Sequence, residues 1–154
     1  MSNGMLVLII EDHSLPIVCY NTTFKVGSRN EFQKTAKSHG ITGMSHLFEH
    51  MMFNGSKKYG EGIFDQLLEA NGGNSNAWTS KDMTSYYEVF PTDCLDLVID
   101  MEADRMANLS LTKKMFTSER DVVKEERRMS IENSIPGTMW EALYKNAFTK
   151  HPYH

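Results

Sequence analysis

The chain has 154 residues, of which 40% are hydrophobic and 23% charged, a composition typical of one globular domain that can bury a core. Its net charge of −4 comes from both signs interspersed along the sequence. This pattern lacks the basic stripe needed to bind nucleic acid or an anionic membrane surface. The longest apolar run, Met5 to Ile10, is too short to span a bilayer and lacks the flanks of a secretion signal. Neither nucleic acid nor a membrane span is therefore expected.

Short apolar runs near the start of the chain predict two strands. The first expected strand covers Leu6 to Ile10. After a turn at Asp12 to Pro16, the segment from Ile17 to Val26 is rich in β-branched and aromatic residues, which predicts a second strand paired with the first. The polar stretch from Gly27 to Gly40 predicts a long exposed loop.

Helical periodicity begins after this loop. From Gly43 to Phe53 the apolar residues recur at helical spacing, and Thr42 is placed to cap the first turn. A second helix is expected from Gly62 to Ala70, where Gly72 and Gly73 provide the C-terminal stop.

The second half of the chain predicts a hairpin followed by helices. Two segments of strand composition, Asn74 to Thr79 and Thr84 to Phe90, are separated by the turn-forming residues Ser80 to Asp82. Two strands, helices, two strands and a run of helices indicate an α+β domain with a mainly antiparallel sheet packed with helices. The helices of that run are expected to begin at Pro91-Thr92, to span about Lys113 to Asn133, and to span Thr138 to Phe148.

The sequence HLFEH at residues 46–50 lies in the first predicted helix. Residues four apart on a helix point the same way, so His46 and His50 can bind one metal ion through two neutral imidazoles. Glu49 falls within the same arc of roughly 100°, where its carboxylate can reach a water on that ion. The alternative is a solvated helix face on which the motif arises by chance. Because the flanking apolar residues predict a mostly buried helix, where such groups need a partner, a cation is favoured.

Catalytic zinc takes three protein ligands and keeps a fourth position for water. On the acidic helix further along the chain, Glu126 shares an apolar stripe with Val122 and Met129, whereas Glu125 turns toward its edge. A carboxylate in such a stripe is costly unless it is paired or metal-bound, so Glu126 is the predicted third ligand. Glu119, two turns earlier and about 10.5 Å away by helical rise, can orient water, substrate or a ligand. The alternative is an ordinary acidic helix of solvated charges.

These features resemble the pitrilysin and insulinase family of inverted-motif zinc metallopeptidases, the inverzincins, particularly its half-size branch with mitochondrial processing peptidases and bacterial zinc proteases. The inverted HxxEH motif carries the resemblance, and further matches cover nearly the whole chain. The matching segments are residues 15–18, 26–31, 40–43, 72–73, 76–79 and 119–120 together with Glu126.

The resemblance implies one zinc ion per chain, with His46, His50 and Glu126 as metal ligands, Glu49 as general base and Glu119 in support. It also implies that Asn76 and Ala77 lie on an edge strand that holds the substrate backbone, as in peptide addition to a sheet edge. The implied reaction is metal-assisted hydrolysis of a peptide bond. Zinc lowers the pKa of its water and polarises the carbonyl, while the general base takes the proton and passes it to the leaving amine.

The family resemblance further implies that more protein takes part. Catalytic domains of the family continue past the position of His154, and a second homologous domain or partner subunit contributes to the substrate pocket. Residues 1–154 are therefore expected to be an N-terminal zinc-binding catalytic domain, cut before its end, and a poor endopeptidase alone. The alternative function is an inactive partner or structural core subunit of the same fold, but such members typically lose zinc residues that are all present here. Envelope proteases among bacterial members point to a periplasmic location.

Overall fold

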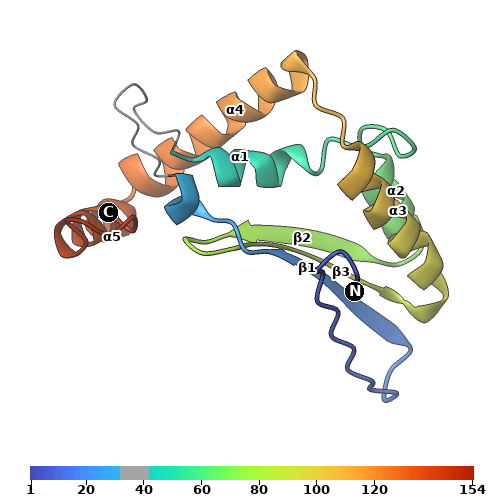
Figure 1. The fold of residues 1–154 in the computed structure, drawn as a ribbon. Coiled ribbons are helices and arrows are strands. Elements are labelled where there is room, and N and C mark those ends of the chain that lie inside the picture. The colour runs from blue at the N-terminus through green and yellow to red at the C-terminus, as the bar shows by residue number, and fades with distance from the viewer. Residues whose placement is uncertain (32–41) are drawn as a thin grey trace.

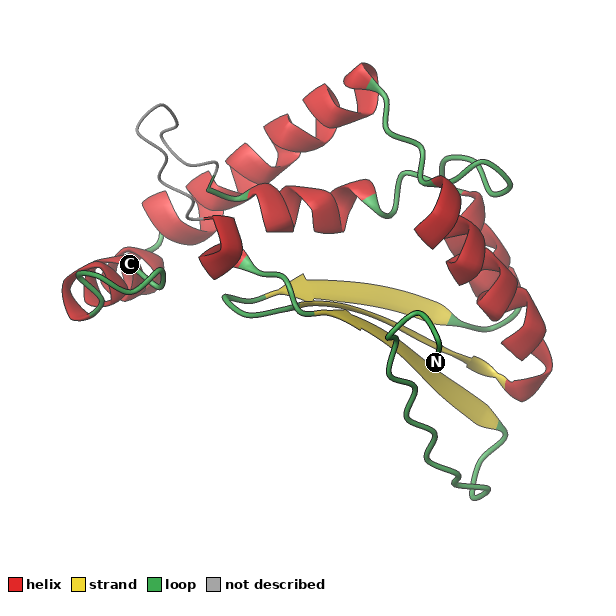
Figure 2. Ribbon diagram, in the orientation of Figure 1, coloured by secondary structure: helices red, strands yellow, loops and turns green. Residues whose placement is uncertain are grey.

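The computed structural model describes residues 1–31 and 42–154, and this part of the chain forms a three-stranded antiparallel sheet and five α-helices. The helices lie over one face of the sheet and at both of its ends (Figure 1, Figure 2). Helices segregated to one side of an antiparallel sheet define an α+β fold, so the predicted fold class is confirmed. Within the predicted loop, Ser28–Glu31 form a 3-10 turn, and residues 32–40 lie outside the described part.

The sheet has the strand order β1-β3-β2. β1 (Ile17–Phe24) and β2 (Asn74–Thr79) both pair antiparallel with the central strand β3 (Thr84–Pro91). The β2–β3 hairpin is closed by a turn in which the N–H of Ser80 donates to the carbonyl of Met83 at 2.8 Å. Three of the four predicted strands are thus confirmed, with bounds that agree to within two residues.

The strand predicted over Leu6 to Ile10 is wrong. This segment has no regular secondary structure, and Ile9 and Ile10 are 81% and 92% exposed. The expected partner, β1, pairs with β3 instead. Composition favours an extended backbone, but a strand forms only where another strand supplies the hydrogen-bonding ladder, and none does so here among the described residues.

The core lies where α2 (Ile63–Ala70) and α3 (Leu95–Asn108) cover one end of the sheet. Gly72 follows α2 in the left-handed region, with φ of 78°, and its N–H donates to the carbonyl of Glu69 at 2.9 Å, so the predicted glycine stop is confirmed. A 3-10 turn, Thr92–Cys94, precedes α3. The buried core residues are Tyr59, Phe64, Leu68, Phe90, Cys94, Val98 and Met101.

The helix α1 (Met44–Met51) begins differently from the prediction. The residue at its N-cap is Gly43, in the left-handed region with φ of 87°, and no side chain of the cap position bonds to the first turn. The carboxylate of Glu31 replaces the predicted Thr42 cap, since it accepts the N–H of Gly43 at 2.7 Å and that of Ser45 at 2.5 Å. A carboxylate at this end also complements the helix dipole.

The last third of the chain is helical. α4 (Lys113–Arg127) continues into a π-helical segment, Arg128–Glu132, and α5 (Ile135–Ala147) follows. The predicted helix from Lys113 to Asn133 is thus confirmed in extent, while α5 begins three residues before its predicted start because Ser134 caps it. α1 lies between the sheet and α4 (Figure 1). In the described residues, no helix has the length and apolar character needed to cross a membrane.

A buried charge cluster joins α3 to the sheet. Glu88 on β3, Glu102 and Arg105 are each at most 2% exposed. Nη2 of Arg105 lies 3.1 Å from Oε1 of Glu88 and also pairs with Glu102, while its guanidinium carbon lies 4.7 Å from the ring centre of Phe64. Burial, and then the charge of Glu102, raise the pKa of Glu88 to about 8. One arginine therefore balances two buried carboxyl groups because one of them is protonated at neutral pH.

We expect this cluster to make stability depend on pH. The pKa of Glu88 is higher in the folded than in the unfolded chain, so the folded state keeps a proton that the unfolded state releases between about pH 4.5 and 8. Stability therefore falls as pH rises through this window, by up to about 1.4 kcal/mol per pH unit. In urea unfolding at pH 5, 6.5 and 8, Glu88→Gln should lose this dependence. An exposed control, Glu69→Gln, should keep it, and parallel curves for Glu88→Gln and the unchanged chain would contradict the assignment.

Candidate metal centre and active site

Two histidines face α4 from α1. His46 and His50 stand one turn apart, their rings meet edge to face with centroids 4.8 Å apart, and their Nε2 atoms are separated by 3.2 Å. The helical spacing of four residues produces this convergence, as the sequence predicts. Both nitrogens point to the same spot in front of the helix, which is the arrangement needed to share one ion.

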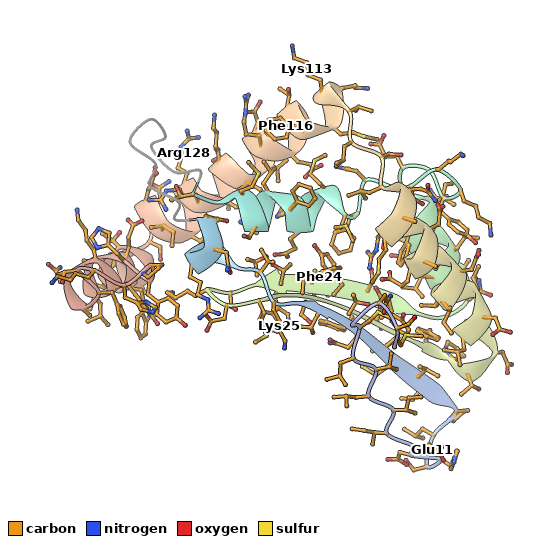
Figure 3. The ribbon with its side chains drawn as sticks, in the orientation of Figure 1. Glu11, Phe24, Lys25, Lys113, Phe116 and Arg128 are labelled. Carbon is orange, nitrogen blue, oxygen red and sulfur yellow. The ribbon has the colours of Figure 1, made fainter. Side chains whose placement is uncertain are left out.

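Glu126 on α4 completes a triangle with these nitrogens. Its Oε2 lies 3.4 Å from Nε2 of His46 and 3.4 Å from Nε2 of His50. Within the described part of the chain, these three side chains form the group whose geometry could hold a metal ion, with ligand atoms within 4.8 Å of one another. α4 runs above α1 from Lys113 in its first turn to Arg128 just beyond its end (Figure 3), which places Glu126 near the end of the helix.

The donor set and its spacing fit zinc. Two imidazole nitrogens and one carboxylate oxygen are ligands that zinc accepts, and around a tetrahedral zinc ion neighbouring ligand atoms stand about 3.3–3.5 Å apart. The two separations of 3.4 Å lie within this range, and the separation of 3.2 Å lies just below it. Side chains of His46 and Glu126 are 40% and 44% exposed, so one side of the triangle is open to solvent. An open side is typical of a site with a free coordination position.

Glu119 contacts the other nitrogen of His50. Its Oε2 lies 3.3 Å from Nδ1 of His50, and both side chains are about four-fifths buried. A carboxylate on Nδ1 holds the proton there and leaves Nε2 with its lone pair free, which sets both the tautomer and the ring direction for metal binding. The two helical turns between Glu119 and Glu126 let one helix contact both nitrogens of the same imidazole.

Glu49 precedes His50 on α1 and is 8% exposed. Its Oε2 accepts a hydrogen bond of 2.5 Å from Oγ1 of Thr79, the last residue of β2. The prediction of a mostly buried helix face is thus correct for this carboxylate and for His50, which is 20% exposed, but not for His46, which is 40% exposed. α1 packs on the sheet with one face and on α4 with the other, and on the side of α4 the side chain of His46 keeps 40% of its surface exposed.

Asn76 and Ala77 lie in the middle of β2, whose outer edge pairs with no other strand of the described chain. The N–H of Ala77 donates to Oδ1 of Asn76 at 2.8 Å, outside the ladder with β3. This N–H therefore lies at the free edge, where an added strand can bond to it. The predicted substrate residues are thus on an edge strand, and the same strand ends at the contact with Glu49.

Thr79 is the functional candidate that the predicted site residues do not include. The available signal was β-strand alternation, because residues two apart in a strand share a face. Ala77 and Thr79 are both half-buried, whereas Trp78 between them is exposed. Which helical residue Thr79 contacts could not be inferred from the sequence, since 30 positions separate it from Glu49.

Comparison with known proteins identifies the class. The sequence model of the insulinase family, peptidase family M16, matches residues 6–154. The chain therefore belongs to this family, which confirms the resemblance inferred from the motif. Its α+β fold matches the folds of solved pitrilysin-like proteases.

Individual relatives carry the names of peptidases. The zinc protease PqqE of Helicobacter pylori is 34% identical over 155 residues, which cover 100% of this chain and 34% of that protein. A probable mitochondrial-processing peptidase subunit β of Arabidopsis thaliana is 26% identical over 99% of this chain and 27% of its own length. The chain thus spans about a third or less of these relatives.

Solved structures agree with these matches. The crystal structure of a protease from Helicobacter pylori superposes with a TM-score of 0.82 at 35% identity, covering 91% of this chain and 32% of that one. Pitrilysin superposes with a TM-score of 0.71 at 32% identity, covering 84% and 13% of the respective chains.

We expect the chain to bind about one zinc ion, because two nitrogens and a carboxylate oxygen already stand at tetrahedral spacing. Elemental analysis after dialysis against zinc and then metal-free buffer measures the stoichiometry. The double variant His46→Ala, His50→Ala should retain none. The matched control removes two exposed histidines, His13→Ala and His151→Ala, and should bind as the unchanged chain does. Stoichiometric zinc in the first double variant would place the site elsewhere.

Proposed function

We propose that the chain is the zinc-binding part of a metalloendopeptidase that hydrolyses peptide bonds with a water activated by Glu49. The observation that carries the proposal is the convergence of His46, His50 and Glu126 at tetrahedral spacing on the open face of α1, with a buried carboxylate, Glu49, on the same short helix. Membership in a peptidase family and relatives named as zinc and processing peptidases support it.

Each residue has a separate task in this proposal. His46, His50 and Glu126 would hold the zinc ion, and Glu119 fixes the ring of His50 through Nδ1. When bound, zinc supplies Lewis-acid chemistry, which polarises a peptide carbonyl and acidifies water. Glu49 takes one proton from the water as its oxygen bonds to the carbonyl carbon. As the carbon–nitrogen bond breaks, the carboxyl group gives this proton to the departing nitrogen, so acid and amine products form without a covalent enzyme intermediate.

The substrate backbone is proposed to add to the outer edge of β2. Ala77 offers its N–H there, and a peptide carbonyl can replace Oδ1 of Asn76 as the acceptor. Main-chain recognition of this kind does not depend on side-chain identity, so it suits an enzyme that cleaves more than one sequence. Because β2 also ends at Thr79 beside Glu49, the strand relates the position of the substrate to that of the base.

A second homologous domain or subunit is proposed to cover the apolar surface near the site. α4 has no buried residue, and α5 has one, Gly137. A cavity of about 960 Å³ lies between α1, the sheet and the end of α3, and Phe24 lines it from the sheet face toward α1 (Figure 3). Contiguous exposed apolar surface marks interaction sites. The exposed apolar residues on the two helices and on the π-helical segment between them include Phe116, Val122, Met129, Met139, Trp140 and Leu143.

Replacing Glu49 by Gln should abolish cleavage of a quenched peptide and leave zinc bound, since the residue acts as a base and not as a ligand. General-base catalysis contributes about 10²- to 10⁴-fold, so the loss should reach at least two orders of magnitude. Glu126→Gln should instead weaken zinc binding. The control, Glu125→Gln, alters an exposed carboxylate of the same helix that pairs with Arg128 and should change neither quantity. Loss of zinc in Glu49→Gln with retention in Glu126→Gln would reverse the two roles.

The 154-residue chain by itself should be a slow peptidase even with zinc bound. The groups that activate water are present, but a misplaced substrate can cost about 10²-fold in rate, and the apolar faces proposed to receive a second domain are open. The assay compares turnover of the chain alone with turnover after a second homologous domain is added in trans. Equal turnover in both would show that the chain needs no partner. Cleavage in neither, with zinc bound, would instead favour an inactive or structural subunit.

A further inference from the structure

We infer that Thr79 is a positioning residue that holds the carboxylate of Glu49 in the orientation needed for proton transfer. The inference rests on the proposed function and concerns a residue to which that function assigns no role. Thr79 contacts neither of the two histidines in the described contacts; it acts through Glu49 alone.

The hydrogen bond between Thr79 and Glu49 can have only one direction, with Thr79 as the donor. A carboxylate only accepts, and a threonine hydroxyl has one proton, so the 2.5 Å bond uses the proton of Thr79 on Oε2 of Glu49. This length is in the range of about 2.5–2.7 Å for hydroxyl-to-carboxylate bonds. The bond occupies Oε2 and leaves Oε1 to receive the proton of the attacking water.

The neighbour of Thr79 across the hairpin, Thr84, leaves the hydroxyl proton of Thr79 to Glu49. Thr84 is the register partner of Thr79, and their Oγ1 atoms lie 3.3 Å apart. Thr84 is 5% exposed and donates its proton to the carbonyl of Val26 at 2.9 Å. The single proton of Thr84 is used on this carbonyl, so Thr84 donates to neither Thr79 nor Glu49. The proton of Thr79 goes to the carboxylate of Glu49 at 2.5 Å and not to the neutral oxygen of Thr84 at 3.3 Å, because an ionised acceptor makes the stronger bond.

The position of Thr79 links the base to the proposed substrate edge. Ala77 and Thr79 lie two positions apart on one strand, which is about 7 Å at a rise of 3.3–3.4 Å per residue. Because β2 is paired with β3 along its full length, this distance is fixed by the sheet and not by a loop. A peptide bonded to the N–H of Ala77 thus has a defined position relative to the carboxylate that Thr79 holds.

The test uses Thr79→Val, which removes the hydroxyl but keeps a β-branched side chain of similar size. In a preparation in which the unchanged sequence cleaves a quenched peptide, kcat should fall about 10- to 100-fold while KM changes less than about threefold and bound zinc remains one per chain. Thr79→Ser restores the hydroxyl and should recover most of kcat. The matched control, Thr23→Val, makes the same change on β1 at a hydroxyl bonded to Ser85 and should leave kcat unchanged.

A second measurement does not depend on activity. In the metal-free chain, Thr79→Val should lower the melting temperature by about 3 °C when Glu49 is present and by less than about 1 °C in a Glu49→Leu background, because the hydrogen bond is lost only in the first case. Equal losses in both backgrounds, unchanged kcat in Thr79→Val, or no recovery in Thr79→Ser would overturn the inference. If the unchanged sequence cleaves no peptide in any preparation, the proposed function fails, and the melting-temperature cycle alone decides whether Thr79 holds Glu49.

Discussion

The candidate site depends on how α1 is held, because an isolated helix of eight residues is not stable in water. Three contacts compensate for its shortness. The carboxylate of Glu31 binds two N–H groups at its start, Thr79 binds Glu49 on the face toward the sheet, and α4 brings Glu119 and Glu126 to the opposite face. Each of these three contacts involves the carboxylate of a glutamate. The interactions that hold α1 in place therefore also supply the acidic groups of the candidate site.

The acidic residues of this chain are placed in environments of different polarity. Glu126 is nearly half exposed, which suits a ligand that must meet an ion from solution. Glu49 is buried with one hydroxyl as its partner, a setting that favours a single carboxylate orientation. Glu88 is fully buried beside Glu102, and burial followed by the charge of Glu102 raises the pKa of Glu88 to about 8, although Arg105 acts in the opposite direction. The α+β scaffold thus gives the proposed metal ligand, the proposed base and a structural acid different burial and partners.

Local periodicity was sufficient to predict much of the architecture and part of the site. The helical spacing of His46 and His50 and the phase of Glu126 on its own helix follow from the sequence, because both concern residues close together in one element. The Glu31 cap and the contact of Thr79 with Glu49 depend on packing between elements distant in the sequence, for which one sequence contains no direct signal. The prediction of a strand at Leu6 to Ile10 was wrong for the same reason, since a strand needs a pairing partner and composition does not indicate which segment that partner is.

The bond between Asn76 and the N–H of Ala77 has a consequence for how tightly an added strand can bind. An edge N–H that is already satisfied does not gain a hydrogen bond when a peptide arrives; it exchanges one acceptor for another, and the freed amide of Asn76 returns to solvent. The net free energy of that exchange is close to zero. The amide also makes this edge less attractive to the strands of other protein molecules. In the proposed peptidase, a peptide held in this way would be aligned with little gain in affinity, so both halves of a cut chain could leave quickly.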